Sequence, residues 1–195
     1  GLTSSAAVVC GPLLYASWCL PNARRSLEMA TADEGSLLEG LLQRRFDAVI
    51  APKPRKFAHP DVVERPLYEL HPQVYARKGH PLARAQSLAQ LQGAAWACVG
   101  PSVSGPVDVL TEAHRVRRMP APKMSVRCPD FASLLHLVAQ SDLLAVVPHP
   151  ALLGGASALV VPLRLAESLP LYGMWLFEPR GRKSRLGPEV FAPAG

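Results

Sequence analysis

Four short segments of this chain combine the residue types found where helices begin next to small ligands. They are residues 10–13 (CGPL), 33–36 (DEGS), 102–104 (SVS) and 127–130 (RCPD). The first backbone N–H groups of a helix are free to donate hydrogen bonds, and in α/β sheets such helix starts follow the carboxyl ends of strands. Together the segments predict a binding site, whereas for any single segment ordinary helix capping is the alternative.

No catalytic set accompanies these segments. A nucleophile elbow needs glycines two residues before and two residues after one serine, and neither Ser102 nor Ser104 has both. No histidine and aspartate can be assigned to a triad from spacing. Asp33 and Glu34 are adjacent and the remaining carboxylates are isolated, so no pair for acid–base chemistry is predicted. The chain is not expected to be an enzyme.

The cysteines and histidines do not form a metal-binding pattern. Cys10, Cys19, Cys98 and Cys128 are scattered, and the sequence contains neither a CxxC pair nor an HExxH pair. Each cysteine lies in or beside an apolar run, where a free thiol packs as a small apolar group. We therefore expect no disulfide framework, no metal and no cofactor.

The net charge of +6 and the isoelectric point near 9.5 would suit a nucleic acid, an anionic ligand or an acidic partner. The arginines, however, fall in small groups, and the 6% of aromatic residues do not alternate with them as a nucleic-acid stacking platform requires. The apolar run 4–20 contains a Gly-Pro step and no basic start. It therefore predicts neither a signal peptide nor a membrane span, and we expect a cytoplasmic protein.

Strand and helix patterns alternate along the chain and must position these segments. In the first part they predict a strand at 6–10, a helix from Pro12, a strand at 27–30, a helix opened by a Ser36–Glu39 capping box, and a strand at 46–51. In the second part they predict an extended stretch at 62–77, a helical turn at 87–91, strands at 94–99, 123–127, 143–147, 159–163 and 171–177, and helices at 107–118 and 131–140, the last capped by Asp130. This alternation predicts two α/β lobes.

Five segments in this order resemble the effector-binding domain of LysR-type transcriptional regulators. They are LLEGLLQRRFDAVIAP (37–52), PLYELHPQVYARKGHPLA (66–83), WACVGPS (96–102), FASLLHLVAQSDLLAVVP (131–148) and LPLYGMWLFEPRGR (169–182). The resemblance implies an α/β, two-lobed type 2 periplasmic-binding-protein fold with two crossover strands as a hinge. Subdomain I would hold residues 1–70 and 179–195, and subdomain II residues 71–178.

The resemblance also implies that a small effector binds between the lobes. By family position its contacts would be Gly11, Pro12, Leu13, Glu34, Ser102, Val103, Ser104, Cys128 and Pro129. The domain would form a homodimer, with a tetramer possible for the whole regulator. It would meet DNA only through an N-terminal winged helix-turn-helix domain, which we expect to be absent from this chain. It would have no membrane partner.

One alternative has the same fold: a periplasmic-type solute-binding protein. The missing signal peptide and four cysteines without a pairing pattern disfavour it, since the periplasm is oxidising. Asp33 and Glu34 depart from the family pattern, in which the position after the second strand is often small and polar. A carboxylate there disfavours a carboxylate effector, so we expect an effector that carries an amine or is largely neutral.

Overall fold

The computed structural model describes residues 1–100, 106–181 and 186, and it divides into two compact units. Unit 1 comprises Gly1–Tyr68 and Gly173–Gly195, and unit 2 comprises Glu69–Tyr172. The sequence-based boundary lay after residue 178. Residues 173–178 group instead with unit 1, because they belong to a strand that pairs with Val49–Pro52 of that unit.

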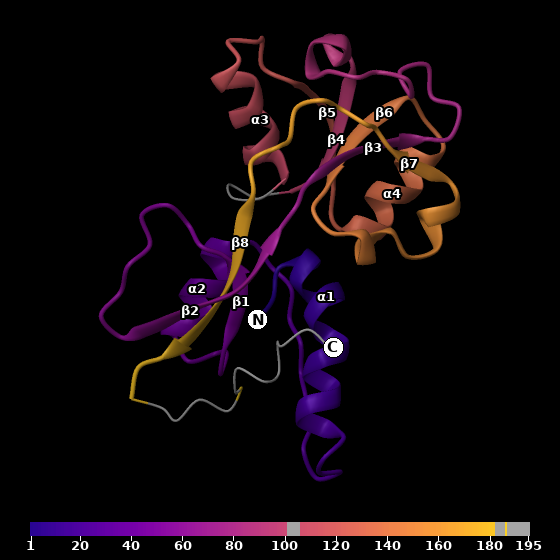
Figure 1. Ribbon diagram of the computed structural model, residues 1–195. Helices are drawn as coiled ribbons and strands as arrows, with labels where there is room; N and C mark the ends of the chain where they lie inside the picture. Colours follow the sequence, from indigo (N-terminus) through magenta and orange to yellow (C-terminus); the bar gives the residue numbers. More distant parts are fainter. Residues whose placement is uncertain (101–105, 182–185, 187–195) are drawn as a thin grey trace. The chain divides into compact units, whose positions relative to one another are not determined.

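Unit 1 contains a three-stranded sheet of β1, β8 and β2 (Figure 1), together with short parallel pairing near the first residues. Its elements are α1 (Ser4–Leu14), a π-helical turn (Tyr15–Cys19), α2 (Glu34–Leu42), β1 (Val49–Pro52), β2 (Val62–Leu70) and β8 (Tyr172–Pro179). Leu2 forms isolated parallel bridges with Thr31 and with Ile50. The sheet has the order β1-β8-β2, and β1 runs antiparallel to β8.

The predicted strand at 6–10 is wrong, because these residues belong to α1. Ala6, Cys10 and Leu14 are buried and lie four residues apart, which places them on one helical face. Burial of that face outweighs the β preference of the two valines, and Pro12 is accommodated inside the helix. The predicted strand at 27–30 is also wrong, since in this region only Thr31 forms a β-bridge.

Helix α2 is confirmed, but it begins earlier than its predicted capping box. Asp33 is the N-cap, and its side chain accepts a hydrogen bond from the Ser36 backbone N–H at 3.0 Å. Leu37, Leu38 and Leu41 pack with Val49 and Phe177 in the core of unit 1. These core contacts fix the position of α2 and therefore of its first turn.

Unit 2 is a five-stranded sheet with helices and 3-10 turns. Its elements are β3 (Gln73–Arg77), a 3-10 turn (Leu88–Leu91), β4 (Ala95–Val99), α3 (Pro106–Val116), β5 (Lys123–Cys128), α4 (Phe131–Ala139), β6 (Leu143–Val147), a 3-10 segment (Pro150–Ala158) and β7 (Val160–Pro162). The strand order is β5-β4-β6-β3-β7. Strand β4 is parallel to β5 and β6, whereas β3 is antiparallel to β6 and β7.

Two apolar clusters cover the two faces of this sheet. One packs α3 residues such as Leu110 against Trp96 and Leu144, and the other packs α4 residues such as Leu134 against Ala97 and Ala145. Neighbouring residues of β4 and β6 thus enter opposite clusters, as the alternation of side chains along a strand requires.

The chain passes between the units twice, at Tyr68–Glu69 within β2 and at Tyr172–Gly173 within β8. Both passages lie in strands that belong to the same three-stranded sheet. The predicted fold class, two α/β lobes joined by two crossover strands, is confirmed. In the described part of the chain, no helix has the length and apolar character needed to cross a bilayer.

Candidate functional site

The candidate site of unit 1 is the edge where its parallel segments end. Leu2 is parallel to both Thr31 and Ile50, so the residues that come after each of them lie at the same edge. Helix α1 starts there with Thr3 and Ser5, which are 8% and 7% exposed and whose hydroxyl oxygens lie 3.4 Å apart. Two buried hydroxyls thus accompany the free N–H groups of the first helical turn.

Helix α2 starts at this same edge and brings a carboxylate to it. The Ser36 hydroxyl donates to Asp33 Oδ2 at 2.7 Å, and the hydrogen bond from the Ser36 backbone N–H is the main reason that the pKa of Asp33 lies below its usual value. Asp33 therefore acts as an ionised cap. The next side chain, Glu34, is only 2% exposed, so the first turn of α2 carries a buried acidic group.

The structure does not place Gly11, Pro12 and Leu13 at a helix start. They lie inside α1, so the predicted strand-to-helix junction at these residues is wrong. Gly11 is one of the buried residues of this helix. Cys10 beside them is fully buried, with its Sγ 3.4 Å from the Tyr68 hydroxyl oxygen. Burial raises the pKa of the Cys10 thiol, which suits packing better than nucleophilic chemistry.

Unit 2 has a corresponding edge, at the carboxyl ends of β4, β5 and β6. The Gly100 N–H donates to the Cys128 carbonyl at 3.1 Å, which joins the exits of β4 and β5. Cys128 is 6% exposed and Pro129 is exposed, and Asp130 then caps α4 by accepting from the Ser133 N–H at 2.7 Å. That backbone hydrogen bond lowers the pKa of Asp130. The predicted contacts Ser102, Val103 and Ser104 lie outside the described residues.

Cys98 and Cys128 lie near this edge on opposite faces of the sheet. Cys98 pairs in register with Arg127 and Cys128 pairs with Val99, so alternation along β5 turns the Cys128 side chain away from the Arg127 face. Arg127 Nη1 contacts Cys98 Sγ at 3.6 Å, and burial raises the pKa of both thiols. All four cysteines are free, and across residues 1–100 and 106–181 no three potential ligands gather around a metal position.

Three polar residues at these edges were missed from the sequence: Thr3, Ser5 and His149. His149 comes after β6, and its Nδ1 accepts a hydrogen bond from the Ala151 N–H at 3.1 Å. The signals were present, since Thr3 and Ser5 lie near the start of the uncharged stretch 1–23 and His149 lies just beyond a buried strand. The predicted strand at 6–10 obscured Thr3 and Ser5, and the dispersed spacing of the histidines gave no sign of a role for His149.

A family model described as the LysR substrate binding domain matches residues 1–191 of this chain. Among solved structures, the regulatory domain of Synechocystis CcmR in complex with 2-PG aligns with a TM-score of 0.79 and 14% identity, over 97% of this chain and 90% of that one. The effector-binding domain of QuiR in complex with shikimate aligns with a TM-score of 0.77 and 15% identity, over 98% and 90%.

A longer protein shares the fold as well. A putative LysR family transcriptional regulator from Pseudomonas aeruginosa aligns with a TM-score of 0.74 and 18% identity, over 92% of this chain but only 63% of its own length. The chain thus corresponds to one part of that protein. At these identities the structural matches establish the fold, and the family model covers nearly the whole sequence. The chain belongs to the LysR substrate binding domain family and is the effector-sensing domain of a LysR-type regulator.

Proposed function

We propose that this domain binds a small effector at the polar helix starts of unit 1 and has no catalytic activity of its own. The observation that carries the proposal is the group formed by Thr3, Ser5 and Glu34, which are polar and at least nine-tenths buried at one strand edge. Cys128 and Pro129, at the corresponding edge of unit 2, remain predicted contacts, as do Ser102, Val103 and Ser104, which lie outside the described residues. Similar domains have been solved with 2-PG and with shikimate, which supports uptake of small molecules by this fold.

The proposed effector carries an amine or is uncharged. Glu34 is 2% exposed in the first turn of α2, where the helix dipole favours a negative side chain. A ligand carboxylate next to it would meet a like charge in a site with little water, whereas an ammonium or hydroxyl group can donate to the Glu34 carboxylate. The hydroxyls of Thr3 and Ser5 can hold the polar remainder of such a ligand.

The test uses matched probes that share a carbon skeleton, namely amines, alcohols and carboxylates of one series. Thermal-shift and calorimetric titrations of the whole chain should give stabilisation by the amine or alcohol member and little by the acid. Glu34→Gln should lower affinity for the amine about tenfold, which equals about 1.4 kcal/mol. Glu39→Gln, on the exposed side of the same helix, is the control and should change nothing.

Two outcomes would contradict this proposal. Tighter binding of the acid than of the amine would reject the proposed effector class, and equal losses in Glu34→Gln and Glu39→Gln would remove the α2 start from the site. Mass spectrometry of the recovered probe tests the absence of catalysis. Conversion of the probe during binding would show that the domain is an enzyme.

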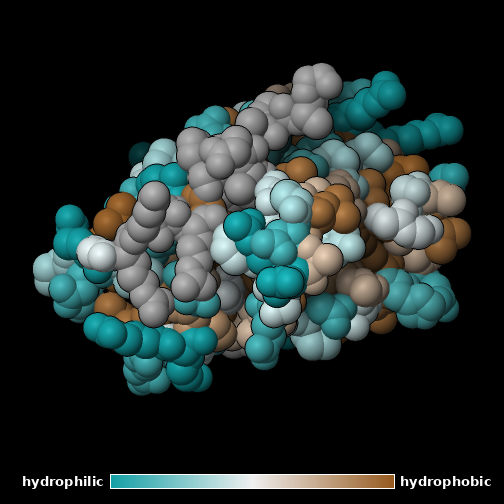
Figure 2. Space-filling model, turned by 90° about the horizontal axis from the view of Figure 1, so that it is seen from below, coloured by the Kyte–Doolittle hydropathy of each residue, from teal (hydrophilic) through white to brown (hydrophobic). Residues whose placement is uncertain are grey.

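We further propose that the domain forms a homodimer through α1. Residues 1–23 contain no charged side chain. Val8 of α1, Tyr15 of the π turn and Leu20, which follows that turn, are 45%, 55% and 64% exposed. Figure 2 shows hydrophobic residues (brown) at the surface of the molecule next to hydrophilic ones (teal). A helix that is apolar all round needs a second covering surface. A second copy supplies a surface that is equally free of charge and closes the assembly by symmetry.

Analytical ultracentrifugation tests this interface. Tyr15→Glu should convert a dimer to a monomer, because dimerisation would bury the new charge. Val116→Glu, at a residue of α3 that is 62% exposed, is the matched control and should leave the dimer intact. A monomeric wild type at high protein concentration would contradict the proposal. In the whole regulator, DNA contacts would come from another part of the protein, acting in the cytoplasm.

A further inference from the structure

Unit 1 contains a cavity of about 460 Å³ that the effector site does not use. We propose that this cavity is a second binding site, for an uncharged aromatic compound of one or two rings. Small-molecule pockets typically enclose about 300–1,000 Å³, so the volume suits a ligand of that size. The proposal is independent of the effector site, since it concerns a different place in the unit.

The cavity lies at the opposite end of the parallel segments from Thr3 and Glu34. Its lining includes Gly1, which precedes Leu2, together with 26–30, which precede Thr31, and 47–48, which precede β1. These are the amino ends of the same parallel segments whose carboxyl ends form the effector edge. A molecule bound here therefore does not occupy the effector edge.

The floor of the cavity is apolar and rigid. Leu2, Leu14 and Ile50 line it and are 3%, 3% and 2% exposed. They belong to the packed interior of unit 1, where side chains are held by their neighbours on every other side. An apolar ligand would complete the burial of these three side chains.

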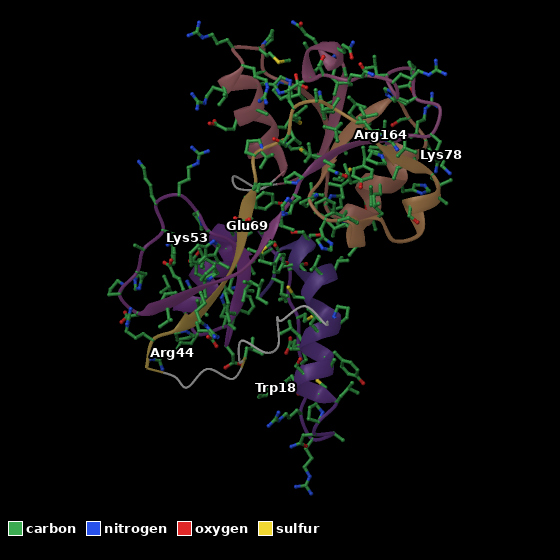
Figure 3. The ribbon with its side chains drawn as sticks, in the orientation of Figure 1. Trp18, Arg44, Lys53, Glu69, Lys78 and Arg164 are labelled. Atoms are coloured by element: carbon green, nitrogen blue, oxygen red, sulfur yellow. The ribbon has the colours of Figure 1, made fainter. Side chains whose placement is uncertain are left out.

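Two aromatic rings form side walls and are held in place. Trp18 lies at the lower end of the indigo helix (Figure 3), its Nε1–H donates to the Ser26 carbonyl at 3.1 Å, and the Arg25 guanidinium lies 4.4 Å from its ring. Phe46 packs against Gly40, where a Cβ would come within 2.6 Å of the Phe46 ring. The absence of that Cβ lets Phe46 lie close to α2, and the rings favour an aromatic ligand.

The charges around the cavity favour an uncharged ligand. Arg45, Glu28 and Asp47 are exposed at its rim, so both signs are present and water screens them. The buried acid Glu178 is already paired with Arg65 at 2.8 Å. Gly1 also lines the cavity, its amino group donates to the Ala48 carbonyl at 2.8 Å, and burial lowers the pKa of that group to about 6. Among the described lining residues no excess of one sign therefore faces the apolar floor, so a ligand charge would lose hydration without gaining a partner.

The experiment uses the whole chain and 2-naphthol, which is uncharged at neutral pH, with 2-naphthoate as its anionic match. Saturation-transfer NMR and titration should show 2-naphthol binding at least about fivefold more tightly than 2-naphthoate. Ala30 lines the cavity and is exposed, so Ala30→Phe narrows the space without disturbing the core and should weaken 2-naphthol binding about fivefold or more. Ala58→Phe, exposed in the same unit but outside the cavity, should bind like wild type.

Melting temperatures of both variants check that they fold, and Met29→Lys at the exposed wall provides a second variant in the cavity. Equal binding by Ala30→Phe and Ala58→Phe, or binding of 2-naphthoate as tight as that of 2-naphthol, would overturn the proposal. Loss of 2-naphthol binding in Glu34→Gln would place the compound at the effector edge and would overturn it as well. Failure of the effector proposal leaves each of these results unchanged.

Discussion

The two units begin a key helix with the same four-residue pattern, and they differ in the residue next to the cap. Asp33-Glu-Gly-Ser36 opens α2 and Asp130-Phe-Ala-Ser133 opens α4. In both, an aspartate accepts from the backbone N–H of a serine three residues later, at 3.0 Å and 2.7 Å. The residue after the cap is a buried carboxylate in unit 1, Glu34, and a buried phenyl ring in unit 2, Phe131.

Because of this difference, the residues that directly follow the two N-caps have different roles. Phe131 joins the cluster of Leu134, Leu135 and Val138, so the start of α4 anchors the helix to its sheet. Glu34 instead keeps a polar group at the edge, while the leucines of α2 anchor the helix one turn later. The cap geometry is thus shared, and the side chain next to the cap decides whether the helix start contributes to the core or to recognition.

Replacing the apolar residue after the N-cap of α4 with a charged one should change the free energy of unfolding most. Phe131→Glu would bury a carboxylate among apolar side chains and should lower the free energy of unfolding by about 4 kcal/mol. Phe131→Leu, the control, should cost about 1 kcal/mol. Urea unfolding followed by tryptophan fluorescence measures both. A loss below about 1 kcal/mol for Phe131→Glu would mean that the two helix starts are interchangeable.

Truncating an anchoring leucine in each unit asks whether the units unfold separately. Leu37→Ala in α2 and Leu134→Ala in α4 should each cost about 3 kcal/mol, because both side chains are at most 1% exposed. A variant that keeps Trp175 as its only tryptophan reports on unit 1, and a variant that keeps Trp96 as its only tryptophan reports on unit 2. We expect each leucine variant to lower the unfolding midpoint reported by the tryptophan of its own unit more than the midpoint reported by the other tryptophan. Equal shifts at both reporters would show that the units unfold as one.

Removing the caps should have a smaller and similar effect in both units. Asp33→Ala and Asp130→Ala should each cost about 1 kcal/mol, since each leaves a backbone N–H of the first turn without its acceptor. Asn at either position preserves an acceptor oxygen and should cost less. Calorimetric melting of the four variants gives the comparison. If the loss of stability in Asp33→Ala differs strongly from that in Asp130→Ala, the two caps are not equivalent.

The exposed ion pair between Arg77 and Asp142 should contribute less still. Arg77 Nε and Nη2 lie 2.9 Å and 2.7 Å from Asp142 Oδ1, and the pair links the end of β3 to the α4–β6 turn. Asp142→Asn should cost about 0.5 kcal/mol and less at high salt. Unfolding curves at low and high salt test this. A loss that does not depend on salt would mean that the contact is not chiefly electrostatic.

Lowering the pH should remove part of the contribution that the two aspartate caps make to the free energy of unfolding. This change should be the smallest of those predicted. The pKa values of Asp33 and Asp130 are lowered in the folded state, mainly by the serine N–H groups. Their contribution is therefore present above the unfolded value of about 3.9 and is lost as pH falls through the folded value. Because both groups are accessible to water, we expect less than about 0.5 kcal/mol per group. Asp130→Asn should remove the part of the pH dependence of stability that comes from the α4 cap. A pH profile of stability equal to that of the wild type would contradict this prediction.

The sequence predicted most of unit 2, because its elements carry strong local signals. The strand at 143–147 and the cap at Asp130 are confirmed, since an apolar run and a capping side chain act over a few residues. No sequence pattern predicted the ion pair of Arg77 with Asp142, which is 65 residues away in sequence. Sequence patterns do not report contacts of that range.

The prediction failed where local preference and burial disagree. In residues 6–10 the valines favour a strand and Pro12 suggests a helix start, but the buried face of Ala6, Cys10 and Leu14 gives a helix that begins eight residues before Pro12. The position of the helix start decides which residues face the candidate site. Glu34 was therefore identified from the sequence, and Thr3 and Ser5 were not.

The place of β8 in its sheet sets the order in which a growing chain can fold. Strand β8 lies between β1 and β2, yet it is synthesised after all of unit 2. The continuous segment Glu69–Tyr172 can therefore complete its five-stranded sheet on the ribosome while β1 and β2 still lack their shared neighbour. Until residues 173–179 emerge, the edges of β1 and β2 that β8 will pair with stay open to other chains. Translation that stalls shortly before β8 should accordingly leave a nascent chain prone to aggregation through unit 1.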